Sequence, residues 1–272
     1  MTLMPWPEGY NAAASFTFDF DAETVWVALD PANAHRPGVL SIGSYGARMG
    51  VHLILDLLAR RGVKATFFVV GRNAELYPAV IERMLADGHE VAIHGYTHTP
   101  PARLTPAEEE DELVRARKAL EACGAKITGY RSPSWDVSPV TLDLLVKHKI
   151  AYSSQFMADI RPYRHESHAL MELPIQWLLD DWPFFAFGPG QMDRPIQSAA
   201  TVETIWAEEF EGIYGLNGHF ILTMHPQVIG RPSRVIMLER LIDKICARKD
   251  VWIATCAEVA AYAEKTLPGV SR

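Results

Sequence analysis

The sequence is short of cysteine, of long apolar runs and of positive charge. Its 272 residues include three cysteines, Cys123, Cys246 and Cys256, too few and too scattered for a disulfide framework, so reduced thiols are expected. The apolar runs fall well below the roughly 18 residues that span a bilayer, and the first residues lack the basic and apolar regions of a signal peptide. A formal charge of −7 argues against a nucleic-acid-binding face. We therefore expect a cytoplasmic protein with no membrane or nucleic-acid partner.

Several catalytic signatures are also missing. The sequence has no Gly-x-Ser-x-Gly turn, no phosphate-binding loop and no dinucleotide-binding glycine pattern. Internal repeats, low-complexity segments and Gly/Ser-rich linkers are absent as well. Apolar residues make up 49% and charged residues 22% of the chain, which is an ordinary globular composition. We therefore expect one continuous domain over residues 1–272.

Short apolar runs alternate with longer amphipathic stretches. The runs predict strands at residues 15–21, 65–70, 90–94, 127–132, 151–156, 170–177, 220–225 and 251–255. The amphipathic stretches predict helices near residues 47–61, 74–87, 106–122, 139–148, 202–213, 233–248 and 257–265. Capping boxes at Thr105 and Thr255 mark two helix starts, and Gly62, Gly88 and Gly124 follow helical runs. Repeated helix–glycine–strand units predict an α/β fold with a mostly parallel sheet, either a (β/α) barrel or an open doubly wound sheet.

Two long segments interrupt this alternation. Residues 22–46 follow the first strand and contain prolines, glycines and aromatic residues, and residues 178–201 follow the sixth strand and carry an aromatic cluster at 182–187. Long loops in compact domains are commonly lids or binding loops, and loops that follow barrel strands build the active site. Both segments are therefore expected to lie near a functional site.

The first polar cluster is Phe-Asp-Phe-Asp at residues 18–21. Because side chains alternate along a strand, Asp19 and Asp21 are expected on the same side. Two carboxylates in one space repel each other, so a cation or a proton is needed between them. The alternative is that both acids cap the loop that follows.

The second polar cluster is His-Gly-Tyr-Thr-His at residues 94–98, directly after a predicted strand. His94 and His98 can turn toward one centre if the chain curls into a helical turn. Two imidazoles and one carboxylate, with positions left for water, suit a catalytic zinc or another first-row divalent metal. The alternative is one core histidine and one surface histidine. The acid pair at another strand end favours the metal site.

Further polar groups follow later strands. His225 is the only other strand-end histidine and is the candidate general acid, with a hydrogen-bonded core histidine as the alternative. Arg131 could hold an aspartate ionised or bind the substrate. Asp180 or Asp181 could orient a histidine, and Arg231 could reach the same rim. The alternative for Arg131 and the two aspartates is a surface salt bridge.

Another histidine pair, His165 and His168, has the spacing of a ligand pair. It lies in a polar stretch with no strand predicted beneath it. We therefore expect both side chains to be solvated.

In this order, the clusters resemble the polysaccharide deacetylase (NodB-homology) family, carbohydrate esterase family four, over about residues 15–262. The resemblance implies a distorted (β/α) barrel of about seven strands and an enzyme that hydrolyses carbon–nitrogen bonds other than peptide bonds. It assigns Asp21, His94 and His98 to a divalent metal, usually Zn²⁺, with Co²⁺, Mn²⁺ and Ni²⁺ as substitutes.

The resemblance also implies roles for the remaining groups. Asp19 would be the general base and His225 the general acid. Arg131 would tune the base, and Asp181 would orient His225, although Asp180 is equally placed by sequence. A backbone N–H near residues 130–131 would help to hold the oxyanion. Substrate contacts are expected from Tyr130, Trp135, Trp182 and Arg231.

The first motif departs from the family pattern, in which two adjacent aspartates precede a glycine. Here Phe20 separates Asp19 from Asp21, so either aspartate remains a candidate metal ligand. This form, with Gly-Tyr between the histidines and a late His-Pro-Gln-x-Ile-Gly-Arg, is more similar to an intracellular branch. That branch includes peptidoglycan deacetylase homologues, metal-independent allantoinases and cyclic imide hydrolases. Its members lack secretion signals and often form tetramers.

The resemblance therefore implies a cytoplasmic, homotetrameric hydrolase that removes N-acetyl groups from a sugar or a related amide. Its partner would be a small-molecule or oligosaccharide substrate. A competing reaction is ring opening of a cyclic amide or imide, with the aromatic segment closed over a flat ring. A non-catalytic sugar- or metal-binding homologue and a divalent-metal lyase or isomerase also fit the pattern, since fold does not fix reaction.

Overall fold

A computed structural model describes residues 4–190, 192–193 and 195–267. Within these residues the strands form one sheet in the order β6-β7-β5-β4-β3-β2-β1-β8, and β9 also pairs with β1. Neighbouring strands are parallel, except for the antiparallel pair of β6 and β7. The strands are β1 (Ala12–Phe20), β2 (Thr66–Val69), β3 (Glu90–Ile93), β4 (Gly129–Tyr130), β5 (Tyr152–Ser153), β6 (Tyr163–Arg164), β7 (Met171–Glu172), β8 (His219–Met224) and β9 (Val251–Ile253).

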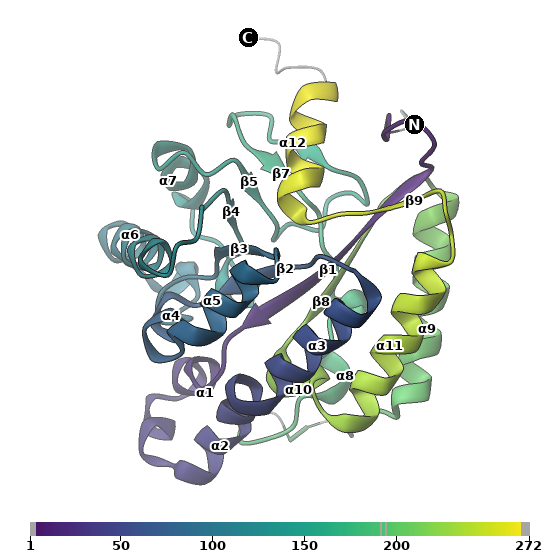
Figure 1. Ribbon diagram of the computed structural model, residues 1–272. Helices are drawn as coiled ribbons and strands as arrows, with labels where there is room; N and C mark the ends of the chain where they lie inside the picture. The colour runs from purple at the N-terminus through teal and green to yellow at the C-terminus, as the bar shows by residue number, and fades with distance from the viewer. Residues whose placement is uncertain (1–3, 191, 194, 268–272) are drawn as a thin grey trace.

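Helices surround this curled sheet (Figure 1). The α-helices are α1 (Thr24–Leu29), α2 (Pro37–Tyr45), α3 (Val51–Arg61), α4 (Gly71–Leu76), α5 (Pro78–Ala86), α6 (Pro106–Ala122), α7 (Thr141–Lys147), α8 (Trp182–Phe185), α9 (Ala199–Gly215), α10 (Pro226–Ile229), α11 (Pro232–Cys246) and α12 (Cys256–Thr266). Short 3-10 helices are η1 (Pro31–His35), η3 (Pro101–Arg103), η4 (Pro133–Trp135) and η5 (Trp177–Leu179), and η2 (Gly46–Gly50) is a π-helix.

The sheet curls into an incomplete barrel. Asp180 forms an isolated parallel bridge with Thr223 of β8, so the segment after β7 returns to the free edge of β8. Inside the curled sheet, apolar residues of the inner face pack against Val259 and Ala260 of α12 and fill that part of the interior. The predicted distorted (β/α) barrel is therefore confirmed, and the open doubly wound alternative is wrong.

The central strand β1 separates an apolar outer face from a polar inner face. Phe16, Phe18 and Phe20 join the core between the sheet and the outer helices. The alternate side chains point to the opposite face, because successive residues of a strand alternate. On that side, Ser15 and Thr17 are buried and hydrogen-bonded, and Asp19 follows them toward the carboxyl end of the strand. One strand thus supplies both the packing that holds the sheet and the first carboxylate of the site.

The predicted strands and helices have counterparts, but the first of the two long segments differs from expectation. Residues 22–46, predicted as a loop, contain α1, η1 and α2 and continue through η2 into α3. Most of the strands after β3 are much shorter than the apolar runs that predicted them, and β6 was not predicted. The capping boxes at Thr105 and Thr255 are both present, and Gly62 ends α3 with a left-handed φ of 64°.

Among the described residues, the helices are either too short or too polar to cross a lipid bilayer.

Candidate active site

The carboxyl ends of parallel strands bring the predicted clusters together. Asp21 follows β1, His94 follows β3, Arg131 follows β4 and His225 follows β8. A cavity of about 420 Å³ opens over these strand ends. It is lined by Asp19, Asp21, Val25, Ala28, Leu29, His94, His98, Pro100, Arg103, Ser134, Trp135, Trp177, Asp180, Trp182, Pro183 and His225.

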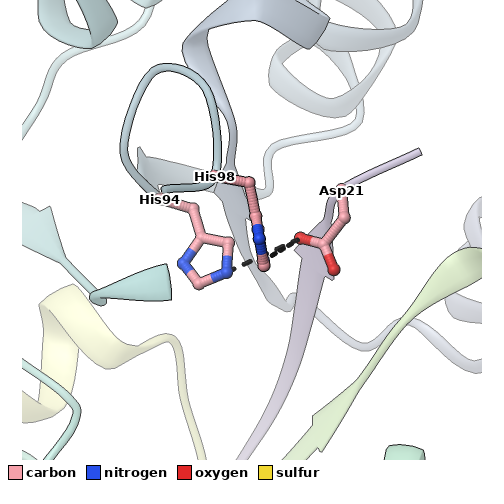
Figure 2. A group of neighbouring side chains, drawn as sticks. All are labelled: Asp21, His94 and His98. Atoms are coloured by element: carbon pink, nitrogen blue, oxygen red, sulfur yellow. Dashed lines mark ion pairs between the residues drawn. The ribbon is translucent and has the colours of Figure 1, made fainter. Parts of the chain in front are cut away.

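Asp21, His94 and His98 form a compact buried group at the centre of this cavity. Figure 2 shows both imidazoles directed at the Asp21 carboxylate, with Nε2 of His94 3.5 Å and Nε2 of His98 3.6 Å from Oδ1. These separations are too long for strong hydrogen bonds. Oδ1 of Asp21 is buried and has no hydrogen-bond partner among the described residues.

The spacing of these atoms fits a small divalent metal. The three ligand atoms lie within 4.8 Å of one another. A tetrahedral site with bonds of about 2.1 Å has ligand atoms about 3.4 Å apart, close to the distances from Oδ1 of Asp21 to the two imidazoles. His94 also presents the correct ring nitrogen, because its Nδ1 lies 2.9 Å from the carbonyl oxygen of Arg131 and must donate to it. Its Nε2 is therefore left with a lone pair, as in metal-binding histidines.

The loop between the two histidines is held by an acid that the sequence motifs did not single out. Glu112 of α6 accepts hydrogen bonds from the backbone N–H groups of Tyr96 and Thr97, each at 2.8 Å. The loop turns sharply at Gly95, where φ is 67°, and His98 itself has a φ of 66°. A non-glycine residue in this left-handed region costs about 1–3 kcal/mol and is most common at functional sites.

Burial determines the charges of this group. It raises the pKa of Asp21 to about 8 and lowers the pKa of both His94 and His98. In the absence of a cation the three side chains are therefore mostly neutral at pH 7. A divalent cation would reverse the preference of Asp21, because metal binding requires the ionised carboxylate and neutral imidazoles.

Asp19 has a different electrostatic environment. Its Oδ1 accepts a hydrogen bond from Nη1 of Arg131 at 2.8 Å, whereas its Oδ2 lies 3.7 Å from Nε2 of His94. Burial alone would raise the pKa of Asp19, but the guanidinium of Arg131, together with His94 and His225, outweighs burial and lowers it. Asp19 is therefore ionised at neutral pH, with Oδ2 directed toward the histidine cluster.

The two sequence-based alternatives for Arg131 are now distinguished. Its guanidinium is fully buried and lies 4.0 Å above the ring of Phe68. Besides Asp19, it donates to Thr17 Oγ1, to the carbonyl oxygen of Ser154 and to Ser154 Oγ, at distances of 2.9–3.0 Å. Because Arg131 makes these four hydrogen bonds to protein groups and does not line the cavity, it can hold Asp19 ionised but is not placed to bind a substrate.

His225 contacts the other carboxylate oxygen of Asp21, Oδ2, whereas His94 and His98 contact Oδ1. Its Nε2 lies 3.6 Å from Oδ2 of Asp21, and its Nδ1 lies 2.6 Å from Oδ1 of Asp181. Oδ2 of Asp181 also accepts the backbone N–H of His225 at 2.9 Å. Burial alone would lower the pKa of His225, but Asp181, with Asp180 and Asp21, raises it well above its ordinary value. The imidazole is therefore protonated and fixed in orientation.

Asp180 is less well placed to orient His225. Its Oδ1 lies 3.7 Å from Nδ1 of His225, and the same oxygen accepts the backbone N–H of Trp182 at 2.7 Å. The geometry therefore favours Asp181 over Asp180, which the sequence alone left equal. Asp180 instead begins the turn that carries Trp182 to an edge-on contact with the His225 ring, 5.2 Å between centroids.

Aromatic side chains line the wall of the cavity. The expected contacts Trp135 and Trp182 are both present there, and Trp177, which the sequence motifs did not indicate, joins them. Trp177 stacks on Trp135 with ring centroids 4.2 Å apart. Ser134 and Trp135 both have left-handed φ values, 58° and 56°, so this turn is strained in order to present the ring.

Two other expected substrate contacts lie elsewhere. The side chain of Tyr130 packs in the apolar core between the sheet and the outer helices, away from the cavity. Arg231 lies over the ring of Tyr45 at 3.7 Å and does not line the cavity. The backbone N–H of Arg131, one candidate for an oxyanion contact, already donates to the carbonyl oxygen of Ile93.

Glycines let the helical segment after β1 pack directly onto the turn that follows β8. A Cβ on Gly46 would lie 2.7 Å from the backbone nitrogen of Gln227, and a Cβ on Gly50 would lie 2.1 Å from the carbonyl oxygen of Pro226. The side-chain amide of Gln227 in turn lies 3.4 Å from Oδ2 of Asp21. Spacing alone did not reveal these glycines, because their function depends on a distant segment.

The expectation that His165 is solvated is wrong. Its Nε2 lies 3.1 Å from Oε2 of Glu172, a fully buried carboxylate on β7. The unpredicted pairing of β6 with β7 brings the loop back over this acid. His168 remains at the surface, with Nε2 3.1 Å from an Asp143 carboxylate oxygen. Neither histidine lines the cavity described above.

The chain is similar in sequence and in fold to several known proteins. A sequence profile described as polysaccharide deacetylase matches residues 45–153. The chain is 27% identical to a peptidoglycan deacetylase from Helicobacter pylori, over 90% of this chain and 94% of that protein. A crystal structure of a Mycobacterium smegmatis protein assigned to the polysaccharide deacetylases superposes with a TM-score of 0.94 and 35% identity, covering 100% of this chain and 98% of that one.

A third similarity is to the fold of a different enzyme. The crystal structure of PuuE allantoinase superposes with a TM-score of 0.86 and 22% identity, over 99% of this chain and 95% of that one. At this level of identity the likeness concerns the fold alone. The near-complete match to the mycobacterial protein at higher identity is what decides the family. The chain therefore belongs to the polysaccharide deacetylase family and is a hydrolase of carbon–nitrogen bonds.

Proposed function

We propose that the protein hydrolyses an unactivated amide with the help of a divalent metal held by Asp21, His94 and His98, and that an N-acetyl group is the leading candidate for the bond attacked. One observation carries the proposal: a carboxylate and an imidazole, each paired with a group of opposite charge, both contact the same three-residue group, with Asp19 Oδ2 3.7 Å from His94 and His225 Nε2 3.6 Å from Asp21. Asp19 is fixed by Arg131, and His225 is fixed by Asp181.

The protein side chains supply the proton transfers. Oδ2 of Asp19, which is not bound by Arg131, accepts a proton from the attacking water. Nε2 of His225 carries a proton into the cavity and gives it to the departing nitrogen. A divalent metal would polarise the scissile carbonyl and lower the pKa of a water toward neutrality. Because amines are poor leaving groups, the proton from His225 is needed for the bond to break.

The metal assignment is tested by replacing His94 with alanine. This change removes one of three ligands, so the variant should lose both its stoichiometric metal, measured by inductively coupled plasma mass spectrometry, and its activity. His35→Ala is a matched control because His35 is exposed on η1, away from the cavity. Adding Zn²⁺, Co²⁺, Mn²⁺ or Ni²⁺ to the metal-stripped parent enzyme should restore its activity. A His94→Ala variant that keeps metal-dependent turnover would refute the assignment.

A second candidate reaction is ring opening of a cyclic amide or imide. The lining of the cavity favours it, because Val25 and Leu29 of α1 join the tryptophans in an apolar wall suited to a flat ring. The same proton transfers would serve, with the ring nitrogen as the leaving group. Metal-restored hydrolysis of dihydrouracil or succinimide without acetate release from N-acetylglucosamine oligomers would favour this reaction over deacetylation.

We also propose one catalytic domain, a cytoplasmic location and a homotetrameric assembly. The single sheet shared by all described strands supports one domain. The location and the tetramer rest on the family resemblance. Light scattering measures the mass in solution, and a monomer of 30.4 kDa would contradict the tetramer.

A further inference from the structure

The cavity has two parts with different chemistry. Its floor contains the titratable groups of the reaction, and two of them, Asp19 and His225, are each paired with a group of opposite charge that does not line the cavity, Arg131 and Asp181. Its walls consist mainly of aliphatic residues, prolines and three tryptophans, with Ser134 and Arg103 as the polar side chains. The floor performs the chemistry, so the walls must determine which molecule is accepted.

The walls offer few groups for recognising hydroxyls. Outside the catalytic floor, Ser134 is the only lining residue with a hydroxyl, and the lining contains no asparagine, glutamine or threonine among the described residues. A sugar chain presents many hydroxyl groups, each of which loses hydrogen bonds to water when it enters an apolar site. The stacked pair of Trp135 and Trp177 instead offers a flat apolar surface. This lining suits a compact substrate with few hydroxyls.

One feature of the wall is charged. Arg103 is the only lysine or arginine that lines the cavity in the described part of the chain. Its side chain is exposed, and within that part the guanidinium has no hydrogen bond or ion pair. Other arginines near the site are already engaged, as Arg131 is by Asp19 and Arg231 is by the Tyr45 ring. The guanidinium of Arg103 is thus available to a ligand.

The backbone that carries Arg103 is well fixed. It is the last residue of η3, which begins at Pro101 and follows Pro100. Two consecutive prolines restrict the backbone, and the N–H of Arg103 donates to the carbonyl oxygen of Pro100 at 2.9 Å. The segment starts only two residues after His98. Arg103 therefore has a defined position relative to the proposed metal ligands.

We propose that the physiological substrate is a compact amide bearing a carboxylate and that Arg103 binds this carboxylate. The inference rests on the proposed amide hydrolysis and narrows its substrate class. A single guanidinium matches one carboxylate through two parallel hydrogen bonds. Three acids line the cavity, and each has a positive partner in the proposed active form: Asp19 pairs with Arg131, and Asp180 lies 3.7 Å from Nδ1 of His225. The third, Asp21, would be a ligand of the divalent metal, so the charge of the floor does not exclude a negatively charged substrate.

The test uses pairs of compounds that differ by one carboxylate. Dihydrouracil and dihydroorotate form a cyclic pair that differs by the carboxylate alone. N-acetylglucosamine and N-acetylmuramic acid form an acetamide pair, in which the acidic member carries its carboxylate on a lactyl ether. For whichever pair is hydrolysed, we expect kcat/KM to be about tenfold to hundredfold higher for the acidic member, the range typical of one charge-assisted hydrogen-bonded contact. Arg103→Gln should bring this ratio close to one, mainly by raising KM, and Arg103→Lys should keep part of it.

Arg60→Gln is the matched control, since Arg60 is exposed on α3 and pairs with Glu239 away from the cavity. It should leave the acidic-to-neutral ratio unchanged. A parent enzyme that prefers the neutral members, or an Arg103→Gln variant that keeps the acidic preference, would overturn the proposal.

A binding measurement separates this proposal from the proposed function. Quenching of tryptophan fluorescence reports ligand entry, because Trp135, Trp177 and Trp182 line the cavity. If none of the four compounds is hydrolysed, the amide-hydrolase substrates are wrong, yet binding of the acidic members that weakens at least tenfold in Arg103→Gln would still support the anion site. Equal binding by the parent and the variant would refute it.

Discussion

Asp181 holds His225 through two accepted hydrogen bonds, and an asparagine in its place can accept with only one of its two terminal atoms. The backbone N–H of His225 can only donate, so it would take the amide oxygen. The NH₂ group would then face Nδ1 and force it to be an acceptor. Asp181→Asn is therefore expected to disfavour the protonated imidazole that the proposed mechanism requires.

The size of the effect follows from the contacts that are lost. A hydrogen bond to a charged group contributes about 1.5–3 kcal/mol, and a buried polar atom left badly paired costs about 1–3 kcal/mol more. Since about 1.4 kcal/mol corresponds to tenfold in rate, kcat for an alkyl amide should fall by about 10²- to 10³-fold. KM should change little, because Asp181 does not line the cavity.

The assay compares two leaving groups. The nitrogen of an N-acetyl sugar or cyclic amide must be protonated to leave, whereas the phenolate of p-nitrophenyl acetate leaves without a proton. Asp181→Asn should therefore lose much more activity on the amide than on the ester. Asp180→Asn is the matched control, since Asp180 lies 3.7 Å from Nδ1 of His225, and its amide kcat should fall less. Equal losses on both substrates would refute the proton-donor role, and a larger loss in Asp180→Asn would reverse the assignment.

Two further predictions concern stability. Burial lowers the pKa of His219 to about 3 in the folded protein, whereas an unfolded histidine has a pKa of about 6.5. Between these two pH values the unfolded chain binds one proton more than the folded chain. The free energy of unfolding therefore falls as the pH falls, by up to about 1.4 kcal/mol per pH unit. His219→Gln should remove about one proton from the slope of unfolding free energy against pH, measured in urea between pH 4 and 6.5, and an unchanged slope would contradict this. Gly46→Ala places a Cβ 2.7 Å from the Gln227 backbone nitrogen, so it should lower the free energy of unfolding by about 1–3 kcal/mol and also lower kcat. Gly212 lies in α9, and a Cβ added there would have nothing within 4 Å, so Gly212→Ala should raise the melting temperature. A similar rise in Gly46→Ala would show that the close approach of Gly46 to Gln227 does not require a glycine.

The parts of the fold that local patterns predict are those stabilised by local rules. Capping boxes, glycine helix ends and the alternation of β1 depend on residues within a few positions of one another, and each was predicted from the sequence. The α1–α2 segment was predicted as a loop because Pro31, Pro37 and its glycines resemble turn residues. In the structure both prolines begin helices, where a missing N–H costs nothing.

In the site, too, the features that follow from local sequence were predicted, and those that depend on distant contacts were not. The strand-end rule correctly brought Asp21, His94 and His225 to one edge of the sheet, because parallel strands end together. The family resemblance gave Tyr130 as a substrate contact, but its side chain packs in the outer core, because residues at a strand end alternate between the two faces of the sheet. Glu112 was missed because it acts from the middle of a helix on a loop that precedes it in the sequence.

The distinction between Asp19 and Asp21 was beyond the sequence for a related reason. Both acids are buried, lie two residues apart and face the same side, yet the pKa of Asp19 is lowered and that of Asp21 is raised to about 8. The largest contribution that lowers the pKa of Asp19 comes from Arg131, which follows β4 more than a hundred residues away and reaches Asp19 at 2.8 Å. An acid that already has a permanent cation remains ionised and can accept a proton, whereas an acid without one gains most from binding a metal. The same physical difference therefore supports Asp19 as the base and Asp21 as the ligand.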